Sequence, residues 1–187
     1  MKLFLYFSHD HARRKIIKNL SLVYFVITIS IVCSCSVKNL YIVRHGEKSI
    51  DCTCDPPLSK EGVDRSAALN NFMDGKRITK IYSTNTHRTI QTAIPVSHAA
   101  GEGIFIYDAT NLNSLINNLK ADRRDNVLVV GHSNTIIETF TALGGVDHLH
   151  IIDENDFDNM LIIRKKFFFG IELSHSSEEI IYGASSP

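Results

Sequence analysis

Short runs of β-branched and aromatic residues, each followed by a stretch with helical features, constrain the fold of this chain more than any other feature. Such runs are typical of strands buried on both faces of a sheet. Strands that alternate with helices predict an α/β domain, a three-layer sandwich whose mostly parallel central sheet is flanked by helices. The expected strands cover residues 39–43, 78–82, 104–107 and 127–130.

The stretches between these runs carry helix signals. Ser59 is the expected N-cap of a helix that has Glu61 in its first turn and ends before Gly75. Pro95 is expected to shorten or kink the next helix, because proline removes a backbone donor. That helix is expected at 88–99, further helices at 112–119 and 134–143, and two more strands at 160–164 and 167–173.

Residues 1–35 are expected to be a targeting segment rather than part of the fold. An uncharged apolar run at 20–32 follows several basic residues, the layout of a signal peptide. It is short for a membrane span, which needs about 20 residues. The tetrad at 32–35, VCSC, resembles a bacterial lipoprotein signal with Cys35 as the lipidated residue. We therefore expect an exported protein, periplasmic or membrane-anchored through Cys35, with its domain at 36–187. A plain cleaved signal peptide, an uncleaved anchor and a buried core helix are the alternatives.

The charge balance argues against nucleic acid as a partner. The chain has 20 Lys plus Arg and 20 Asp plus Glu, so it lacks the basic excess that follows a phosphate backbone. Without the basic N-terminal segment the remainder is mildly acidic and repels polyanions at long range. A phosphate site must then be built from a few local cations.

The strand ends supply such cations. Arg44 and His45 follow the first expected strand, and Gly46 lets the backbone turn there. Arg88 opens the helix after the second strand, and His132 follows the fourth. Because ligands in such sheets bind outside the carboxyl ends of the strands, these side chains are expected to converge. Arginine matches phosphate oxygens, and a neutral imidazole can form a covalent phosphoryl intermediate.

The ordered segments LYIVRHGEK, DPPLSKEG, YSTNTHRTIQTA and VLVVGHSN resemble the histidine phosphatase superfamily, with its phosphoglycerate-mutase-like fold, over about residues 38–165. Within it the chain resembles the small single-domain phosphatases that lack a cap insertion. The resemblance implies a phosphomonoester hydrolase in which His45 becomes phosphohistidine, while Arg44, Arg88 and His132 hold the phosphate. It implies no metal and no cofactor, and a phosphorylated small molecule or phosphoprotein as substrate.

The proton donor to the leaving group is expected among two carboxylates. The resemblance points to an acidic residue after the third strand, here Asp108, which is expected to be buried with a raised pKa. Glu47 competes, since it lies two residues after His45.

Other functions must also be weighed. VVGHSNT approximates the nucleophile elbow of an α/β-hydrolase with Ser133 as the reactive residue, although Thr135 stands where the final glycine belongs. A non-catalytic lipoprotein could bind a phosphorylated ligand in the same pocket. A mutase would need insertions that exclude water, and none is evident.

Three polar clusters have simpler interpretations than metal binding. Cys52 and Cys54 favour a surface loop with two thiols over a metal half-site or a strained local disulfide. Residues 147–150 are interpreted as a polar turn. The acidic run at 153–158 lacks the glycine of a calcium loop and is expected to be a solvated turn or helix start.

Overall fold

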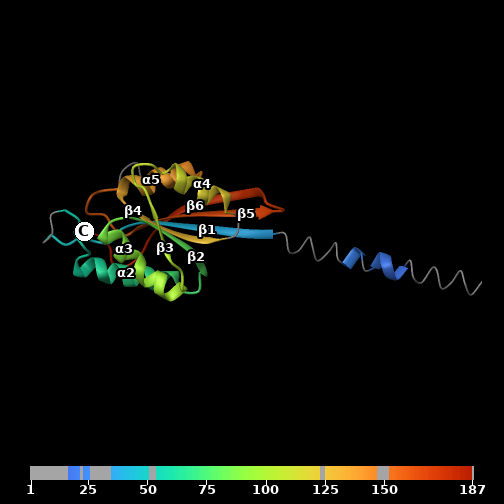
Figure 1. Cartoon of the computed structure of the whole chain (residues 1–187), viewed down its shortest axis with the longest axis horizontal. Helices are drawn as coiled ribbons and strands as arrows, with labels where there is room; N and C mark the ends of the chain where they lie inside the picture. The colour runs from blue at the N-terminus through green and yellow to red at the C-terminus, as the bar shows by residue number, and fades with distance from the viewer. Residues whose placement is uncertain are drawn as a thin grey trace, which may run out of the picture.

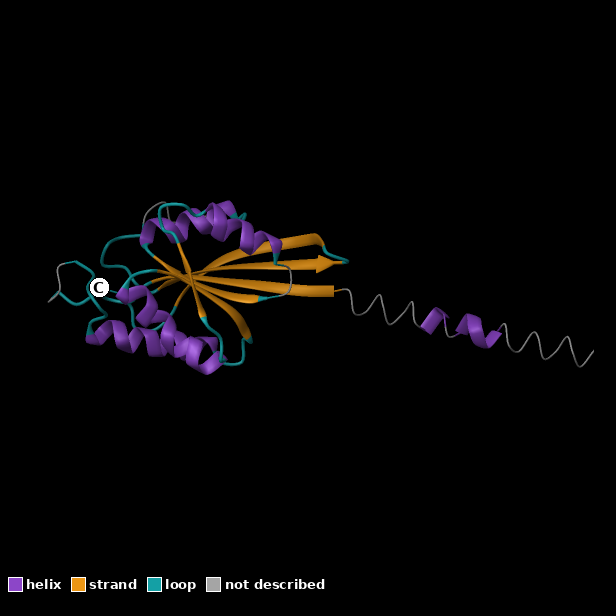
Figure 2. Ribbon diagram, viewed as in Figure 1, coloured by secondary structure: helices purple, strands orange, loops and turns teal. Residues whose placement is uncertain are grey.

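A six-stranded sheet lies between two pairs of helices in the computed structural model, with α2 and α3 on one face and α4 and α5 on the other (Figure 1). The structure describes residues 17–21, 23–25, 35–50, 54–122, 125–146 and 152–186. The three layers confirm the predicted α/β sandwich (Figure 2). The elements are β1 (Cys35–Arg44), α2 (Lys60–Met73), β2 (Ile78–Thr84), α3 (His87–Ala100), β3 (Ile104–Tyr107), α4 (Asn113–Ala121), β4 (Asn126–Gly131), α5 (Ser133–Ala142), β5 (Asn159–Phe168) and β6 (Ile171–Ile181).

The strand order is β3-β2-β4-β1-β5-β6. The first four strands are parallel, and β5 and β6 add an antiparallel hairpin at one side. The carboxyl ends of the parallel strands therefore meet at one edge of the sheet, where Arg44 of β1 lies opposite Gly131 of β4. This is the edge at which the sequence places its arginines and histidines.

The core is divided by the sheet, because successive side chains of a strand point to opposite faces. On β1, Leu40 joins a cluster with Phe140 of α5, whereas Tyr41 joins a cluster with Leu69 of α2. The central strands are covered on both faces, which explains their uninterrupted apolar sequences.

Several element boundaries follow the predictions and two do not. Ser59 caps α2 as expected, since its side chain accepts a hydrogen bond from the Gly62 nitrogen at 3.2 Å. Helix α3 continues through Pro95 to Ala100, so the expected shortening is wrong. The chain also forms β5 and β6 rather than strands at 160–164 and 167–173. Lys165 lies inside β5, where it pairs with Glu172 across the hairpin.

The targeting segment is described only in part. Residues 17–21 and 23–25 are helical with exposed side chains, and residues 26–34 lie outside the described part of the chain. Cys35 is the exposed first residue of β1 and pairs with Phe168, and the boundary between a targeting segment and the domain stays a prediction. No helix within the described ranges is long and apolar enough to cross a membrane. Cleavage and lipidation at Cys35 stay predictions.

Leu69→Ala should lower the free energy of unfolding by about 2–5 kcal/mol, because it opens a cavity at a fully buried position of α2. Val63→Ala on the same helix, where the side chain is 54% exposed, should change it by about 0.5 kcal/mol or less. Urea denaturation of both variants measures the difference. Equal losses would contradict the packing of α2 on the sheet.

Candidate active site

His45 leaves the end of β1 in a tightly packed turn. Its backbone nitrogen donates to the carbonyl oxygen of Gly131 at 3.0 Å, which continues the pairing of β1 with β4 by one residue. A Cβ on Gly46 would lie 2.9 Å from the carbonyl oxygen of Gly62. Helix α2 thus packs directly on the turn, and only glycine fits at position 46.

The imidazole of His45 is buried and neutral. Its Nδ1 lies 2.7 Å from the Gly46 carbonyl oxygen, which can only accept, so Nδ1 carries the proton. Burial first, and then the nearby charges of Arg88 and Arg44, lower the pKa of His45 to about 3 against the opposing effect of the Gly46 bond. The Nε2 lone pair is therefore available as a nucleophile at neutral pH.

Arg44 is fixed by the loop that precedes β5. Its Nη1 donates to the carbonyl oxygens of Asp153 at 2.7 Å and Asp156 at 2.8 Å, and its Cζ lies 4.3 Å from the ring centre of Phe157. Nε is buried and has no hydrogen-bond partner among the described residues. A guanidinium held in this way presents a donor without having to reorient.

The same loop shows that the expectation for residues 153–158 is only partly right. Asp153 and Glu154 are exposed, as a solvated turn requires, but Phe157 and Asp158 are buried. The ring of Phe157 packs against Arg44 and also lies 6.0 Å from the ring of His45, centre to centre. Sequence reasoning missed this contact, because nothing local distinguishes an aromatic residue within an acidic run as part of a pocket.

His132 comes to His45 from β4. The two ring centres are 5.4 Å apart. His132 Nδ1 lies 3.5 Å from Arg88 Nη2, which can only donate, so Nε2 carries the proton toward the Thr84 hydroxyl oxygen at 3.0 Å. Burial first, then the charges of Arg88 and Arg44, lower the pKa of His132 to about 4.

Arg88 is paired with a carboxylate that the sequence analysis did not single out. Its Nη1 lies 3.3 Å from Oδ1 of Asp55. The same carboxylate accepts hydrogen bonds from the His87 backbone nitrogen at 3.1 and 3.2 Å, at the amino end of α3. Arg88 Nε is buried without a partner among the described residues. Asp55 thus occupies donors that suit an anionic ligand.

The structure brings together the four side chains expected to converge, namely Arg44, His45, Arg88 and His132. Two positive charges next to a neutral imidazole form a pocket that can bind an anionic phosphoryl group and attack its phosphorus. Thr84 contacts His132, Asp55 contacts Arg88 and Phe157 contacts Arg44, so these three residues surround the group.

Asp108 differs from its expectation. It is exposed in the turn after β3, and its Oδ1 accepts bonds from the Thr110 nitrogen at 2.8 Å and hydroxyl at 2.7 Å. The hydroxyl and the backbone bond lower its pKa, because both stabilise the ionised form. The expectation of a buried carboxyl with a raised pKa is therefore wrong.

Glu47, the competing carboxylate, serves as an anchor. It forms an ion pair with Arg65 of α2, with Arg65 Nη2 at 2.6 Å from Glu47 Oε1. Arg65 Nη1 also donates to the carbonyl oxygens of Tyr182 and Ala184. The ion pair ties the turn after His45 to α2 and to the C-terminal residues.

The hydrolase alternative receives no support from Ser133. A nucleophile elbow is strained, yet the non-glycine residues with positive φ in the described ranges are Arg77 and Phe169. Ser133 opens α5, and the Thr135 hydroxyl accepts from the His132 nitrogen at 2.9 Å. This serine has the backbone of an ordinary helix start.

Some predictions fall outside the described ranges. Cys52 is among them, so the state of Cys52 and Cys54 stays a prediction. Asp147, His148 and His150 also lie outside the described ranges, so the polar turn expected there stays a prediction as well. Among the residues that the structure does describe, no three or more His, Cys, Asp or Glu side chains are grouped so as to hold a metal ion.

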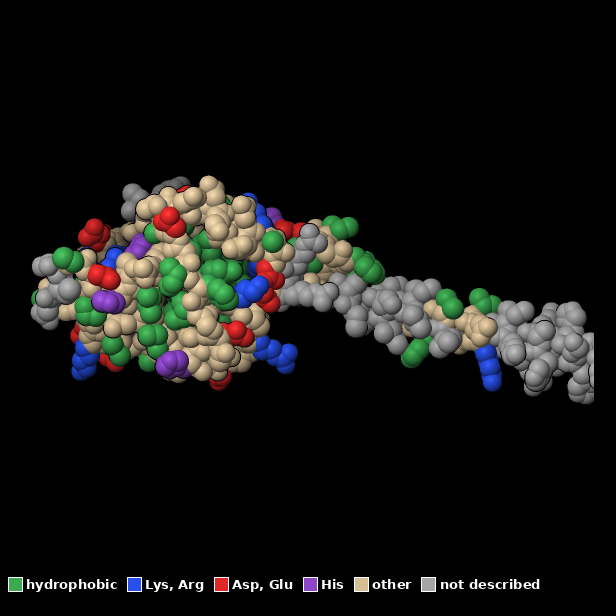
Figure 3. All heavy atoms as spheres, viewed as in Figure 1, with side chains coloured by type: hydrophobic (Ala, Val, Ile, Leu, Met, Phe, Trp, Pro, Cys, Tyr) green, Lys and Arg blue, Asp and Glu red, His purple; other side chains and the backbone are tan. Residues whose placement is uncertain are grey.

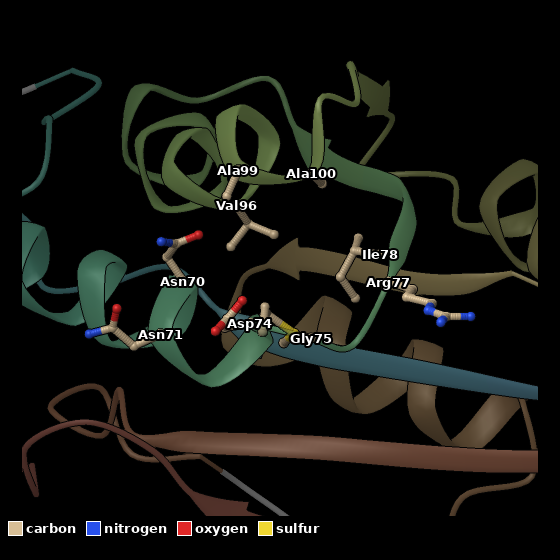
Figure 4. Close-up of a pocket in the computed structure, with 10 residues that line it drawn as sticks. Asn70, Asn71, Asp74, Gly75, Arg77, Ile78, Val96, Ala99 and Ala100 are labelled. Carbon is tan, nitrogen blue, oxygen red and sulfur yellow. The ribbon is translucent and has the colours of Figure 1, made fainter.

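A separate cavity of about 570 Å³ lies at the amino end of β2, away from the histidines at the carboxyl ends of the parallel strands (Figure 4). It is lined by the last residues of α2 and α3 and the start of β2, with Asp74 and Arg77 as its charged side chains. Since β2 reaches the histidine pocket at Thr84, its other terminus, this cavity is not part of that pocket.

One protein-family model matches part of the chain. The model of the histidine phosphatase superfamily (branch 1) matches residues 40–112. No curated protein matches the chain.

Solved structures share the fold. A putative phosphohistidine phosphatase SixA from Nakamurella multipartitia is 18% identical, with a TM-score of 0.55 over 80% of this chain and 97% of that one. A mycobacterial glucosyl-3-phosphoglycerate phosphatase is 15% identical, with a TM-score of 0.59 over 80% of this chain and 100% of that one. A protein histidine phosphatase SixA complexed with tungstate is 18% identical, with a TM-score of 0.54 over 74% and 96%.

The matched residues include the turn that carries Arg44, His45 and Gly46, as well as Arg88 at the start of α3. His132 lies beyond the match but adjoins these residues in the fold. The family match thus covers the segment from β1 to the residue before α4, and the solved structures show that the chain shares their fold.

Proposed function

We propose that this protein is a metal-independent phosphomonoester hydrolase that acts through a phosphohistidine at His45. One observation carries the proposal: a buried, neutral imidazole lies beside two guanidinium groups whose Nε donors are buried and have no partner among the described residues. Structural arginines usually have their buried donors satisfied. Here both guanidinium groups lie close enough to His45 for their charges to lower its pKa.

The proposed cycle has two displacements. His45 Nε2 attacks the phosphorus, the bond from phosphorus to the ester oxygen breaks, and that oxygen leaves with the bonding electrons. Water then attacks phosphohistidine, releasing inorganic phosphate and restoring the imidazole. Arg44, Arg88 and His132 hold the non-bridging oxygens and stabilise their charge in both transition states.

The proton donor for the leaving oxygen is not assigned by these contacts. Asp108 is exposed and bonded in its ionised form, and Glu47 is paired with Arg65. A phenolate with electron-withdrawing substituents leaves without prior protonation. An aryl phosphate therefore tests the nucleophile separately from the acid.

We propose a phosphorylated small molecule or a phosphoprotein as the substrate class. The structurally similar proteins include phosphatases named for phosphohistidine and for glucosyl-3-phosphoglycerate, so both classes occur on this fold. We also propose that the protein is exported and held near a membrane by its N-terminal segment, on the sequence argument alone.

His45→Ala should lower the hydrolysis of p-nitrophenyl phosphate by roughly a thousandfold or more, because the covalent route is lost. His98→Ala, a change at an exposed histidine of α3, should retain activity. EDTA should affect neither protein. Full activity in His45→Ala would exclude the mechanism, whereas a folded wild type that binds vanadate without turnover would indicate a binding protein.

The buried histidines predict the pH dependence of stability. Folded His45 and His132 bind protons less readily than in the unfolded chain, so the unfolded state gains more protons below about pH 6.5. The free energy of unfolding should therefore decrease as the pH drops below about 6.5, by roughly 1.4 kcal/mol per pH unit for each histidine. The decrease should level off near the folded pKa values, about 4 for His132 and about 3 for His45. Urea unfolding of ligand-free protein at several pH values measures this slope. His45→Asn should make it shallower and His98→Asn should not, so equal slopes in all three proteins would refute the shifted pKa of His45.

Asp55→Asn should strengthen inhibition by inorganic phosphate, because the Asp55 carboxylate competes with phosphate for Arg88 and for the amino end of α3. Asp55 is partly exposed, so a gain of about two- to fivefold is expected, the size of a solvent-screened charge pair. The measurement is competitive inhibition of p-nitrophenyl phosphate hydrolysis at low ionic strength, with Asp64→Asn on the exposed side of α2 as the control. Weaker phosphate inhibition would contradict the competition. A lower kcat with unchanged inhibition would instead make Asp55 a proton carrier.

A further inference from the structure

The β5–β6 hairpin ends in a group of exposed apolar side chains, here called the hairpin tip. The exposed fractions are 61% for Phe169, 68% for Ile171 and 65% for Leu173, and Val37 at the start of β1 is 50% exposed. An exposed apolar group of this kind marks a surface that contacts another protein or a membrane. Figure 3 shows apolar side chains gathered at this end of the domain.

The register of the sheet places these residues beside the start of the domain. Cys35 of β1 lies opposite Phe168 of β5, and Val37 lies opposite Lys166. Phe168 in turn lies opposite Ile171 of β6. Figure 1 shows the hairpin and the start of β1 at the same end of the sheet, beyond the helices. The hairpin tip and the point where the N-terminal segment joins the domain are thus one surface.

Folding alone does not explain the aromatic residue in the turn. Phe169 has φ of +48° and Gly170 has φ of +76°, so both residues between the strands are left-handed. Asparagine or glycine is the usual choice at the first of these positions, and a bulky side chain there costs about 1 kcal/mol or more. The Phe169 ring packs edge-on against Phe168, 4.7 Å between centres, while most of its surface is exposed. A strained turn that displays an aromatic ring favours a role for that ring at the surface.

The neighbouring sequence indicates what covers the tip. The uncharged run at 20–32 is separated from Cys35 by Cys33 and Ser34 alone. A bilayer that takes up this run would lie at the hairpin end of the domain. The tip also combines aromatic rings with exposed Lys166, a pairing typical of the interface between lipid and water.

We propose that the hairpin tip is a membrane-docking surface whose apolar side chains enter the interfacial layer of the bilayer to which the N-terminal segment is attached. The proposal rests on the proposed attachment of the N-terminal segment to a membrane and is independent of phosphatase chemistry. Because His45 lies at the other end of β1, docking leaves the histidine pocket open to solvent. The tip gives the domain a second contact with the membrane and so a defined orientation on it.

The absence of tryptophan from the chain allows a direct test. The Phe169→Trp variant of the full chain is reconstituted into vesicles of phosphatidylethanolamine and phosphatidylglycerol. Its tryptophan should emit at shorter wavelength there than in the same variant dissolved in detergent-free buffer with urea. Lipids brominated on their acyl chains should quench it. Phe105→Trp is the control, a phenylalanine of comparable exposure (52% against 61%) on β3 at the opposite edge of the sheet, and it should not be quenched.

Every result bears on the proposal. Equal quenching of the two tryptophans, or none in either, would overturn it. A blue-shifted Phe169→Trp signal that brominated lipids do not quench would show the tip buried against a second copy of the chain, which also overturns it. Leu173→Trp repeats the measurement should the turn variant misfold. Hydrolysis of p-nitrophenyl phosphate by each variant reports the pocket separately, so a failed phosphatase assignment would leave the quenching result standing.

Discussion

The pairing of β1 with β4 is the constraint on which the pocket depends. The two strands run parallel in a register that sets Arg44 beside Gly131, and the bond from the His45 nitrogen to Gly131 extends it by one residue. The next residue of each strand is a histidine, so the two imidazoles meet at the sheet edge. A shift by one residue would turn the side chains of β1 to the opposite faces and separate the histidines. The apolar alternation that fills both halves of the core therefore also aligns the reactive groups.

The positive charge at that edge of the sheet comes from two arginines, Arg44 and Arg88, and not from a general excess of basic residues. Arg44 is oriented by backbone carbonyls and by the face of Phe157; burial lowers its pKa, and the nearby charges of Glu154, Asp156 and Asp153 oppose that effect. Arg88 does face Asp55, but on the more exposed side of the pocket. Both arginines favour the neutral forms of the histidines, and burial acts in the same direction. The site is thereby prepared to receive an anion and not a proton.

The fold and the central site could be predicted because they depend on local patterns. Buried strands have apolar sequences, and residues that follow parallel strands meet at one edge, so Arg44, His45, Arg88 and His132 were within reach of sequence reasoning. The contacts that were missed join distant segments. Phe157 reaches Arg44 from a loop that has no pattern of its own, and the ion pair of Glu47 with Arg65 depends on how closely α2 approaches the turn at Gly46. Asp108 shows the same limit, because its burial could not be judged from its position after β3.

The length of β1 sets a distance that matters for any attached form of the protein. Cys35 begins this ten-residue strand and His45 follows its last residue. An extended strand rises about 3.3 Å per residue, so the reactive imidazole lies roughly 30 Å from Cys35. A domain tethered at Cys35 with β1 pointing away from the lipid therefore holds its pocket beyond the layer of lipid head groups. In that geometry β1 acts as a rigid spacer that sets the distance between the reactive imidazole and the point of attachment.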